Sequence, residues 1–347
     1  MKRKLIILID YRRQFWLKTT HKEANFNLSH LKEVFENLNY NVSMKQFCEI
    51  DFKNSNYKNY YIFYQSSEDP NLFYKSFIED ILLGLQMQGA YLIPSFEFFR
   101  AHHNKVFMEI LRDIKGNTQI QSLKSYYFGT YEEFKNDLLL TPEKKYVFKL
   151  AAGAQSKNVK LLNNNRQFYS IPKKMSRSYN FYYWLVDKVK PYWKKRYPVY
   201  ERKSSHRRKF ILQEFIEGLN GDFKILVFPY KIFVLSRKIR SNDFRASGSG
   251  KFEFIQDVPS YILSFAQMVY NLFEVPFISL DVADNKGTPQ LIEFQFTSFG
   301  TYTAEQAPFY FINTPTGGWM TQESKIDLEE EIAAAVHYYI NTLNKSY

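Results

Sequence analysis

Two carboxylates and one amide lie close together in residues 277–296. Asp281 stands near the end of the apolar segment Phe277–Val282. Glu293 and Gln295 are two positions apart in the next apolar segment, Gln290–Phe296. Side chains two apart in a strand share a face, so a hairpin would gather these three oxygen donors. Mg²⁺ prefers such hard ligands and is usually held by one or two carboxylates plus phosphate oxygens. The pattern indicates a magnesium site, although an ordinary exposed strand face has the same pattern.

A second candidate is a lysine followed by small residues. Lys149 ends the apolar segment 145–149, and the segment 151–159 after it contains three alanines, Gly153, Gln155 and Ser156. A loop of small residues can close over phosphate groups and offer them backbone N–H donors. Taken alone, a plain hairpin turn explains the same residues.

Two further segments could complete a nucleotide site. Residues 212–218 combine an extended apolar stretch with acidic residues. Such a segment could bind adenine and ribose, and a plain edge strand is the alternative interpretation. Residues 236–250 place Arg237 and Arg245 beside a Ser/Gly loop whose backbone amides can meet an anionic oxygen. A flexible basic surface loop is the alternative for the second segment.

The elements that must position these residues follow from the apolar periodicity. The first hundred residues alternate strand-like and helix-like segments, which favours a small parallel sheet. A helix is expected at 101–111, and a strand pair at 145–149 and 160–162. From Phe210 onward the pattern is antiparallel, with helices at 258–272 and 325–343. The expected N-terminal strands and helices are 5–9, 28–38, 60–64, 73–85 and 91–94, and the later strands are 210–215, 223–228, 232–236, 277–282 and 290–296.

The order of these motifs resembles the ATP-grasp superfamily, and within it the RimK and glutathione synthetase type of carboxylate–amine ligase. The resemblance covers roughly residues 100–300. It implies an α/β chain with the α+β ATP-grasp fold, in which an N-terminal Rossmann-like domain (1–98) precedes a two-lobed ATP-grasp domain (99–347). The lid of that domain would span about 120–212.

The resemblance also implies a role for each matching residue. The chain would use ATP and Mg²⁺, with Mn²⁺ as a substitute, to join a carboxylate and an amine through an acyl phosphate and release ADP. Arg245 and Arg237 would be catalytic. The nucleotide would be bound by Lys105, Lys149, Gly153, Gln155, Ser156, Glu214, Phe215, Ile216 and Glu217, and the metal by Asp281, Glu293 and Gln295.

Two positions depart from the family pattern. Gln295 stands where the family usually has Asn, and Lys224 replaces a more usual Arg. A catalytically silent ATP-binding subunit is therefore a second hypothesis. Residues 64–68, 102–103 and 296–303 are where we expect the acceptor to bind, and 297–302 is the segment that we favour. The candidate substrates are an anionic glycan, a peptide or a small metabolite, and the resemblance implies a homodimer.

The strongly basic balance points to an anionic partner. The net charge is +12, and residues 165–209 crowd Lys and Arg among aromatic side chains. This segment could bind an anionic macromolecular substrate. Alternatively, it is a helical insertion whose charged side chains are solvated. A third hypothesis, a nucleic-acid-binding protein, uses the same aromatic and basic residues but leaves Asp281, Glu293 and Arg245 unexplained.

Composition excludes some classes of protein. Cys48 is the only cysteine, so an internal disulfide or a Cys-rich zinc site is excluded. No apolar run approaches the roughly 20 residues that cross a bilayer, so no transmembrane segment is expected. The apolar stretch 5–9 is followed at once by Asp10 and two arginines, which favours a first strand over a secretory signal. We therefore expect a cytoplasmic protein.

Overall fold

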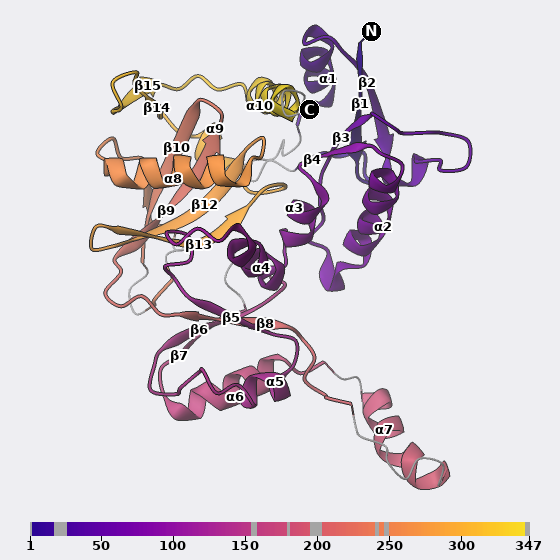
Figure 1. Cartoon of the computed structure of the whole chain (residues 1–347), viewed down its shortest axis with the longest axis vertical. Helices are drawn as coiled ribbons and strands as arrows, with labels where there is room; N and C mark the ends of the chain where they lie inside the picture. The colour runs from indigo at the N-terminus through magenta and orange to yellow at the C-terminus, as the bar shows by residue number, and fades with distance from the viewer. Residues whose placement is uncertain are drawn as a thin grey trace. The chain divides into compact units, whose positions relative to one another are not determined.

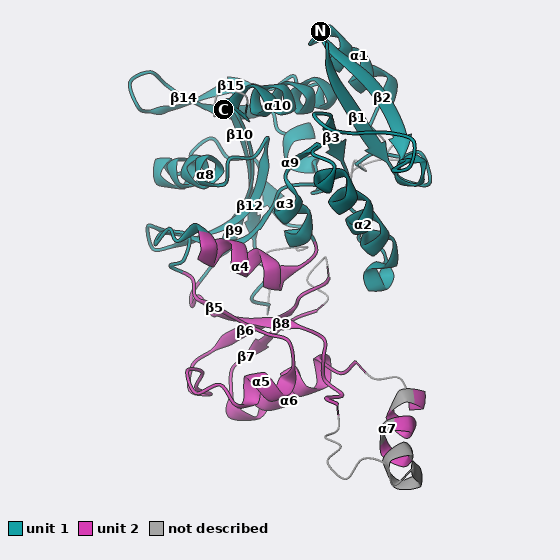
Figure 2. Ribbon diagram, turned by 45° about the vertical axis from the view of Figure 1, so that its right-hand side comes forward, with its two compact units in different colours: residues 1–102, 115–122, 219–347 teal, residues 103–114, 123–218 magenta. Residues whose placement is uncertain are grey.

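The computed structural model describes residues 2–16, 26–153, 158–178, 181–194, 203–239, 243–245 and 250–343. The chain forms two compact units, shown in different colours in Figure 2. Unit 1 consists of residues 1–102, 115–122 and 219–347, and unit 2 consists of residues 103–114 and 123–218. The domain boundary at residue 98 and the lid at 120–212 stay predictions.

Unit 1 contains a parallel sheet of four strands in the order β2-β1-β3-β4 (Figure 1). The expected strands 5–9, 60–64 and 91–94 correspond to β1, β3 and β4. The pattern missed β2, because only Tyr40 and Val42 of this edge strand are buried and apolar. The elements are β1 (Arg3–Ile9), α1 (Leu28–Asn37), β2 (Tyr40–Gln46), η1 (Phe47–Glu49), β3 (Tyr61–Tyr64), η2 (Pro70–Leu72), α2 (Phe73–Met87), β4 (Tyr91–Ile93) and α3 (Phe96–Ala101).

The second sheet of unit 1 is antiparallel and runs in the order β13-β12-β9-β10-β14-β15, with β11 paired to β10. Helix α8 packs on the strands β9 and β12 and on the edge strand β13. The C-terminal strand pair β14–β15 was not expected from the sequence. The elements are β9 (Gly221–Phe228), β10 (Lys231–Lys238), β11 (Phe252–Glu253), α8 (Ser260–Phe273), β12 (Ile278–Asn285), β13 (Thr288–Gln295), α9 (Tyr302–Glu305), β14 (Phe309–Asn313), β15 (Trp319–Glu323) and α10 (Leu328–Leu343).

One apolar core joins both sheets of unit 1. The inward side chains of β1 and β3 pack with Phe228 and Phe233 of the antiparallel sheet, with Phe277 just before β12, and with α10. Trp16 lies in this core, with its ring centroid 5.0 Å from that of Phe277 and 4.9 Å from that of Phe299. Its indole N–H donates to the Phe299 carbonyl at 2.8 Å. The core thereby fixes the loop after β13 against the carboxyl ends of the parallel strands.

Trp16→Ala should destabilise the protein by about 3–5 kcal/mol, the range for truncating a buried tryptophan. The variant loses both ring contacts and leaves the Phe299 carbonyl without its donor. Urea unfolding followed by circular dichroism measures the change. Leu138→Ala is the control, because Leu138 is 94% exposed and its replacement should change stability by no more than about 0.5 kcal/mol. Equal midpoints for the two variants would contradict this account of the core.

Unit 2 is built on an antiparallel sheet in the order β5-β8-β6-β7. Its core combines leucines of the sheet with phenylalanines from the sheet and from α5 and α6, such as Phe134, Phe148 and Phe168. Helix α5 begins with a capping box in which Thr130 and Glu133 each satisfy a backbone N–H of the other. The elements are α4 (Lys105–Lys115), β5 (Ser125–Phe128), α5 (Tyr131–Lys135), β6 (Tyr146–Leu150), β7 (Val159–Leu162), α6 (Asn165–Met175), α7 (Phe181–Lys194) and β8 (Phe210–Glu214).

Among the described residues, no helix is both long and apolar enough to cross a membrane.

Candidate functional site

Two buried lysines lie close to the loop that follows β6. One is in β6 itself, and the other begins helix α4 and contacts the loop. Lys149 is only 5% exposed, and its Nζ donates to Gln213 Oε1 on the adjacent strand β8 at 2.8 Å. Lys105, the first residue of α4, donates from Nζ to the Gly153 carbonyl at 3.1 Å. Its backbone N–H donates to the carbonyl of Ala151. Within unit 2, the structure thus anchors both predicted phosphate-binding lysines beside the small-residue loop.

A buried glutamate, which sequence reasoning missed, accompanies these lysines. Glu109 is 1% exposed and lies one turn after Lys105 on α4. Its Oε2 is 3.2 Å from Arg112 Nε. Burial raises the pKa of the Glu109 carboxyl, and the charges of Arg112 and Lys149 partly offset that rise. The only signal in the sequence is the four-residue spacing from Lys105, which places both side chains on one helix face.

The loop after β6 is described up to Gly153 and again from Asn158. Gly153 has a φ of +143°, and a Cβ there would meet Asn158 Nδ2 at 2.8 Å. Glycine is therefore required at this turn. The predicted phosphate-binding residues Gln155 and Ser156 lie outside the described residues.

The segment predicted to hold adenine and ribose follows β8 directly. The backbone N–H of Phe215 donates to the Lys145 carbonyl at 3.1 Å. Lys144 Nζ is 3.4 Å from Glu214 Oε1, and Lys145 Nζ is 2.7 Å from Glu217 Oε1. The hydrogen bond from Lys145 lowers the pKa of the exposed Glu217 carboxyl. Ile216 is half-buried. Lys144 and Lys145 therefore balance the acids of this segment, which the sequence alone did not show.

In unit 1, the predicted metal ligands share one face of the antiparallel sheet. Asp281 on β12 lies directly opposite Glu293 on β13, and Ser279 lies opposite Gln295. Residues directly opposite each other point to the same side, so the hairpin gathers the three donors as the spacing predicted. A bulge follows Asp281, where the register shifts before Val282, and bulges commonly re-aim a side chain.

Three charged residues on the same sheet surround Asp281. Lys224 on β9 lies opposite Asp281, with its Nζ 3.1 Å from Oδ1. Arg237 on β10 contacts Asp281 Oδ2 at 2.9 Å and binds both carboxylate oxygens of Asp222 at 2.6 and 2.8 Å. Strands β9 and β10 approach so closely here that a Cβ atom on Gly221 would lie 2.2 Å from the carbonyl oxygen of Arg237. The sequence reasoning placed Asp281 and Arg237 in the site but did not identify Asp222.

The electrostatics of this network favour an ionised Asp281. Burial on its own would raise the pKa of the Asp281 carboxyl, but Arg237 and Lys224 outweigh it and hold that pKa well below its usual range. Burial would also lower the pKa of the Arg237 guanidinium, and the two aspartates raise it above its ordinary value instead. Asp281 is therefore ionised near neutral pH, and Arg237 and Lys224 balance its charge.

The protein side chains supply only some of the ligands that a Mg²⁺ ion needs. Within the described ranges, no group of three or more His, Cys, Asp or Glu side chains is placed to hold a metal ion. Two carboxylates and the Gln295 amide remain, all oxygen donors on one sheet face. Such a set suits Mg²⁺ when phosphate oxygens and water supply the other ligands.

Arg245, which the resemblance assigns to catalysis, forms an ion pair with Asp243 two residues earlier. The closest contact is 2.6 Å, between the guanidinium and Asp243 Oδ2. The hydrogen bond from Arg245 is the main reason that the pKa of the Asp243 carboxyl is lowered. Arg245 is 30% exposed, so its side chain is accessible to an anion.

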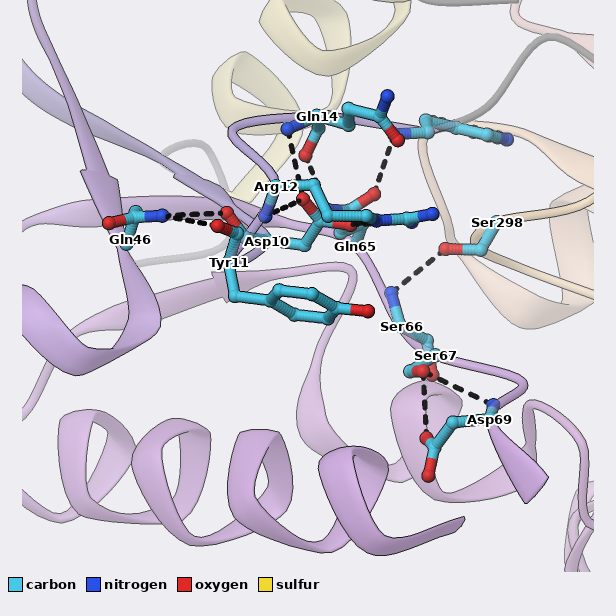
Figure 3. Close-up of polar contacts among 11 residues, drawn as sticks. Asp10, Tyr11, Arg12, Gln14, Gln46, Gln65, Ser66, Ser67, Asp69 and Ser298 are labelled. Atoms are coloured by element: carbon cyan, nitrogen blue, oxygen red, sulfur yellow. Dashed lines mark hydrogen bonds and ion pairs between the residues drawn. The ribbon is translucent and has the colours of Figure 1, made fainter.

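A further polar cluster lies at the carboxyl ends of the parallel strands of unit 1, where Figure 3 shows the side chains converging. Asp10, directly after β1, accepts the backbone N–H groups of Arg12 and Gln14 at 2.8 and 2.9 Å. Gln46, the last residue of β2, donates to the carbonyls of Asp10 and Tyr11. Ligands of open parallel sheets bind outside this edge, where the strand order reverses. In the order β2-β1-β3-β4 this reversal lies between β1 and β3.

Two of the segments expected to face the acceptor meet at this edge. The Ser66 backbone N–H, just after β3, donates to Ser298 Oγ at 2.8 Å (Figure 3). Ser298 has a φ of +52°, a conformation uncommon for a residue with a side chain. The third segment is close by, since His102 Nε2 is 3.5 Å from Glu68 Oε1. The sequence predicted these loops but not their polar neighbours Asp10 and Gln46.

The chain is similar to known proteins in its three-dimensional structure but not in its sequence. No family model matches the chain, and no curated protein matches its sequence. The chain resembles the crystal structure of D-cycloserine synthetase DcsG with a TM-score of 0.55 and 10% identity, covering 96% of this chain and 99% of that one. D-alanine–D-alanine ligase from Bacillus anthracis gives a TM-score of 0.53 at 10% identity, with 99% and 100% covered. The ATP-grasp ligase PsnB, complexed with minimal precursor, Mg and ADP, gives 0.52 at 10% identity, with 96% of each chain covered.

This chain has the ATP-grasp fold. The expected fold class is therefore confirmed. The match extends over nearly the whole chain, so the ATP-grasp fold includes the N-terminal parallel sheet as well as the motif-bearing residues 100–300. At about 10% identity it is the fold that is shared, and the roles of single residues stay predictions.

Proposed function

We propose that the protein is an ATP- and Mg²⁺-dependent ligase that joins a carboxylate to an amine through an acyl phosphate and releases ADP. The observation that carries this proposal is the cross-strand pairing of Asp281 with Glu293, beside Gln295, on the antiparallel sheet of an ATP-grasp fold. The neighbours of known fold support it, because they include ligases complexed with Mg and ADP.

The residues of unit 2 would bind the nucleotide. Lys105 and Lys149 would contact the phosphates, under a loop that includes Gly153, Gln155 and Ser156. The segment after β8 would receive the base and the sugar, with Glu214, Phe215 and Ile216 at adenine and Glu217 at ribose. Buried lysines fit this role, since positioning and charge neutralisation dominate phosphoryl transfer.

The residues of unit 1 would hold the metal and the reacting groups. Asp281, Glu293 and Gln295 would bind Mg²⁺, or Mn²⁺ in its place. When bound, the ion neutralises charge on phosphate oxygens. Arg237 and Lys224 hold Asp281 ionised and oriented. Arg245 would stabilise the transferred phosphoryl group, which requires its exchange from Asp243.

The acceptor would bind at the strand-end edge formed by Asp10, Gln46, Ser66 and Ser298. We propose that this edge positions the carboxylate and amine substrates, which are a small metabolite, a peptide or part of an anionic macromolecule. The edge combines the uncharged side chains of Gln46 and Ser298 with an ion pair in which Arg12 contacts Asp10 at 2.6 Å. The Arg12 side chain is 46% exposed, so it could bind a substrate carboxylate, and the neutral groups would orient the substrate.

Calorimetric titration of the full chain with ATP and Mg²⁺ tests the proposal first. Clear binding that weakens when EDTA removes the metal would support it, and a screen of carboxylates and amines by ADP release would follow. A folded protein that does not bind ATP would overturn the proposal. Tight ATP binding with no ADP release from any acceptor would favour a catalytically silent subunit instead. One observation favours that second candidate, namely that Lys224 and Arg237 already neutralise Asp281.

Arg245→Ala should lower kcat by about a hundredfold and change ATP affinity by less than about threefold. A residue that stabilises charge developing in the transition state affects kcat rather than binding. Rates of ADP formation and ATP titrations on the same preparations separate the two effects. Lys251→Ala is a suitable control, because Lys251 is an exposed cation nearby in the chain. A loss of ATP affinity with kcat unchanged would place Arg245 in nucleotide binding.

A further inference from the structure

Positive charge is concentrated in one of the two units. Unit 2 contains 23 Lys and Arg against 10 Asp and Glu, whereas unit 1 contains 24 against 25. Residues 173–209 alone hold 13 basic residues and two acidic ones. A nucleotide carries only a few charges, so the excess exceeds what ATP binding requires. The excess positive charge of unit 2 would therefore attract a further anionic partner with an extended surface.

The same segment presents an apolar helix face to solvent. In α7, Phe181 is 69% exposed, Tyr182 65%, Leu185 44% and Val189 40%. At 100° per residue these four side chains fall within an arc of about 100°. Trp184 lies outside that arc, stacked on Phe181 with ring centroids 5.8 Å apart and with Lys188 Nζ 4.3 Å from its ring centroid. The helix thus has an aromatic and aliphatic face flanked by a cation.

The two ends of the segment that carries α7 are joined at its base. The Ser178 backbone N–H donates to the Ser205 carbonyl at 2.9 Å, and that of Arg208 donates to the Ser176 carbonyl at 3.0 Å. Lys203 and Arg207 are exposed beside this junction. Neither forms an ion pair with any residue that the structure describes, whereas the neighbouring Glu132 is held by Ser204 and His206. The cations at the base are therefore available to an external anion.

We propose that α7 and the basic residues at its base bind the surface of a membrane that contains anionic lipids. A helix with a basic polar side and exposed Phe, Tyr and Leu residues lies in the interface between headgroups and acyl chains. With 14 residues it is about 21 Å long, too short to span the hydrocarbon core, so it lies along the surface. Tyrosine and tryptophan favour this interface, and each nearby Lys or Arg strengthens binding to anionic lipid roughly fivefold.

The aliphatic residues decide between lipid and nucleic acid. Single-stranded nucleic acid binds to stacking aromatic rings and to cations along its backbone. Leu185 and Val189 offer nothing to such a ligand and would stay exposed to water in the complex. A lipid surface buries them together with Phe181 and Tyr182. The membrane is therefore the occupant that accounts for the whole face.

Flotation of the full chain with lipid vesicles tests the proposal. Vesicles of phosphatidylcholine with about one third phosphatidylserine should bind the protein, and pure phosphatidylcholine should bind it at least about tenfold more weakly. The double variant Phe181→Ser/Leu185→Ser should lower binding to the anionic vesicles by about tenfold or more. Lys203→Glu/Arg207→Glu should lower it similarly and reduce its dependence on salt. Leu138→Ser/Leu139→Ser, which alters exposed leucines of unit 2 outside α7, should bind like the wild type.

Several results would overturn the proposal. The proposal fails if the wild type does not bind anionic vesicles. It also fails if both Phe181→Ser/Leu185→Ser and Lys203→Glu/Arg207→Glu bind these vesicles as tightly as the wild type does. The protein could also bind single-stranded RNA more tightly than vesicles, with Phe181 and Leu185 dispensable, which would identify nucleic acid as the partner. The two double variants are independent, so the loss of one to misfolding leaves the other informative. ATP titration of each variant separates this surface from the nucleotide site, whose residues are unchanged.

Discussion

Lys149→Ala should weaken ATP binding by about two orders of magnitude. Truncating one partner of a buried, hydrogen-bonded charge contact costs about 2–5 kcal/mol, and Lys149 is both buried and proposed to contact the phosphates. Titration calorimetry with Mg²⁺ measures the loss.

The structure also predicts a cost to unit 2 itself in this variant. Gln213 would lose its donor, and Glu109 would lose a nearby positive charge. A lower melting temperature should therefore accompany the loss of binding. Lys160→Ala is the matched control, because Lys160 is an exposed lysine on the paired strand β7, and its removal should leave affinity unchanged. Wild-type affinity in Lys149→Ala would refute the phosphate assignment.

Asp281→Asn should reduce Mg²⁺-dependent turnover by about a thousandfold while the chain stays folded. The substitution removes a charged oxygen ligand from a site that has few protein ligands. ADP formation across a Mg²⁺ titration is the measurement. Asp284→Asn serves as control, because Asp284 holds the hairpin turn through the Gly287 N–H and has no part in the proposed site. Unchanged ADP formation in Asp281→Asn would disprove the metal assignment.

The same variant should alter how stability depends on pH. The folded-state pKa of Asp281 lies below its unfolded value, so its contribution is complete above about pH 4 and is lost as pH falls further. With EDTA present, the melting temperature of the wild type should therefore drop more steeply between about pH 4 and 2 than that of Asp281→Asn. Parallel curves would indicate that Arg237 and Lys224 do not stabilise the ionised carboxyl.

The sequence predicted what depends on local spacing. The hairpin that brings Asp281 opposite Glu293 follows from two apolar segments joined by a short turn, and the alternation of strands and helices at the N-terminus predicted a parallel sheet. The structural comparison confirms the fold inferred from the order of the motifs. The roles of the individual residues stay predictions.

What the sequence did not predict depends on register between distant strands. Asp222 and Arg237 meet because β9 pairs with β10 in one register, and no single segment encodes that choice. Glu109 resembled any charged helix residue until α4 placed it in the interior of unit 2. Strand β2 was missed because the exposed residues Asn41 and Ser43 alternate with buried ones, so it lacks the continuous apolar run of a central strand.

The junction at the base of α7 has a consequence for how such a chain can evolve. Two backbone hydrogen bonds hold residues 176–178 against residues 205–208, so the distance that any connecting segment must bridge is already fixed. Doubling the length of a flexible connection costs only about 0.6 kcal/mol in closure entropy. Segments of different length and composition can therefore be exchanged at this point while the phenylalanine core beneath is kept. The junction is a place where an ancestral fold could acquire, replace or lose an inserted segment without rebuilding its two compact units.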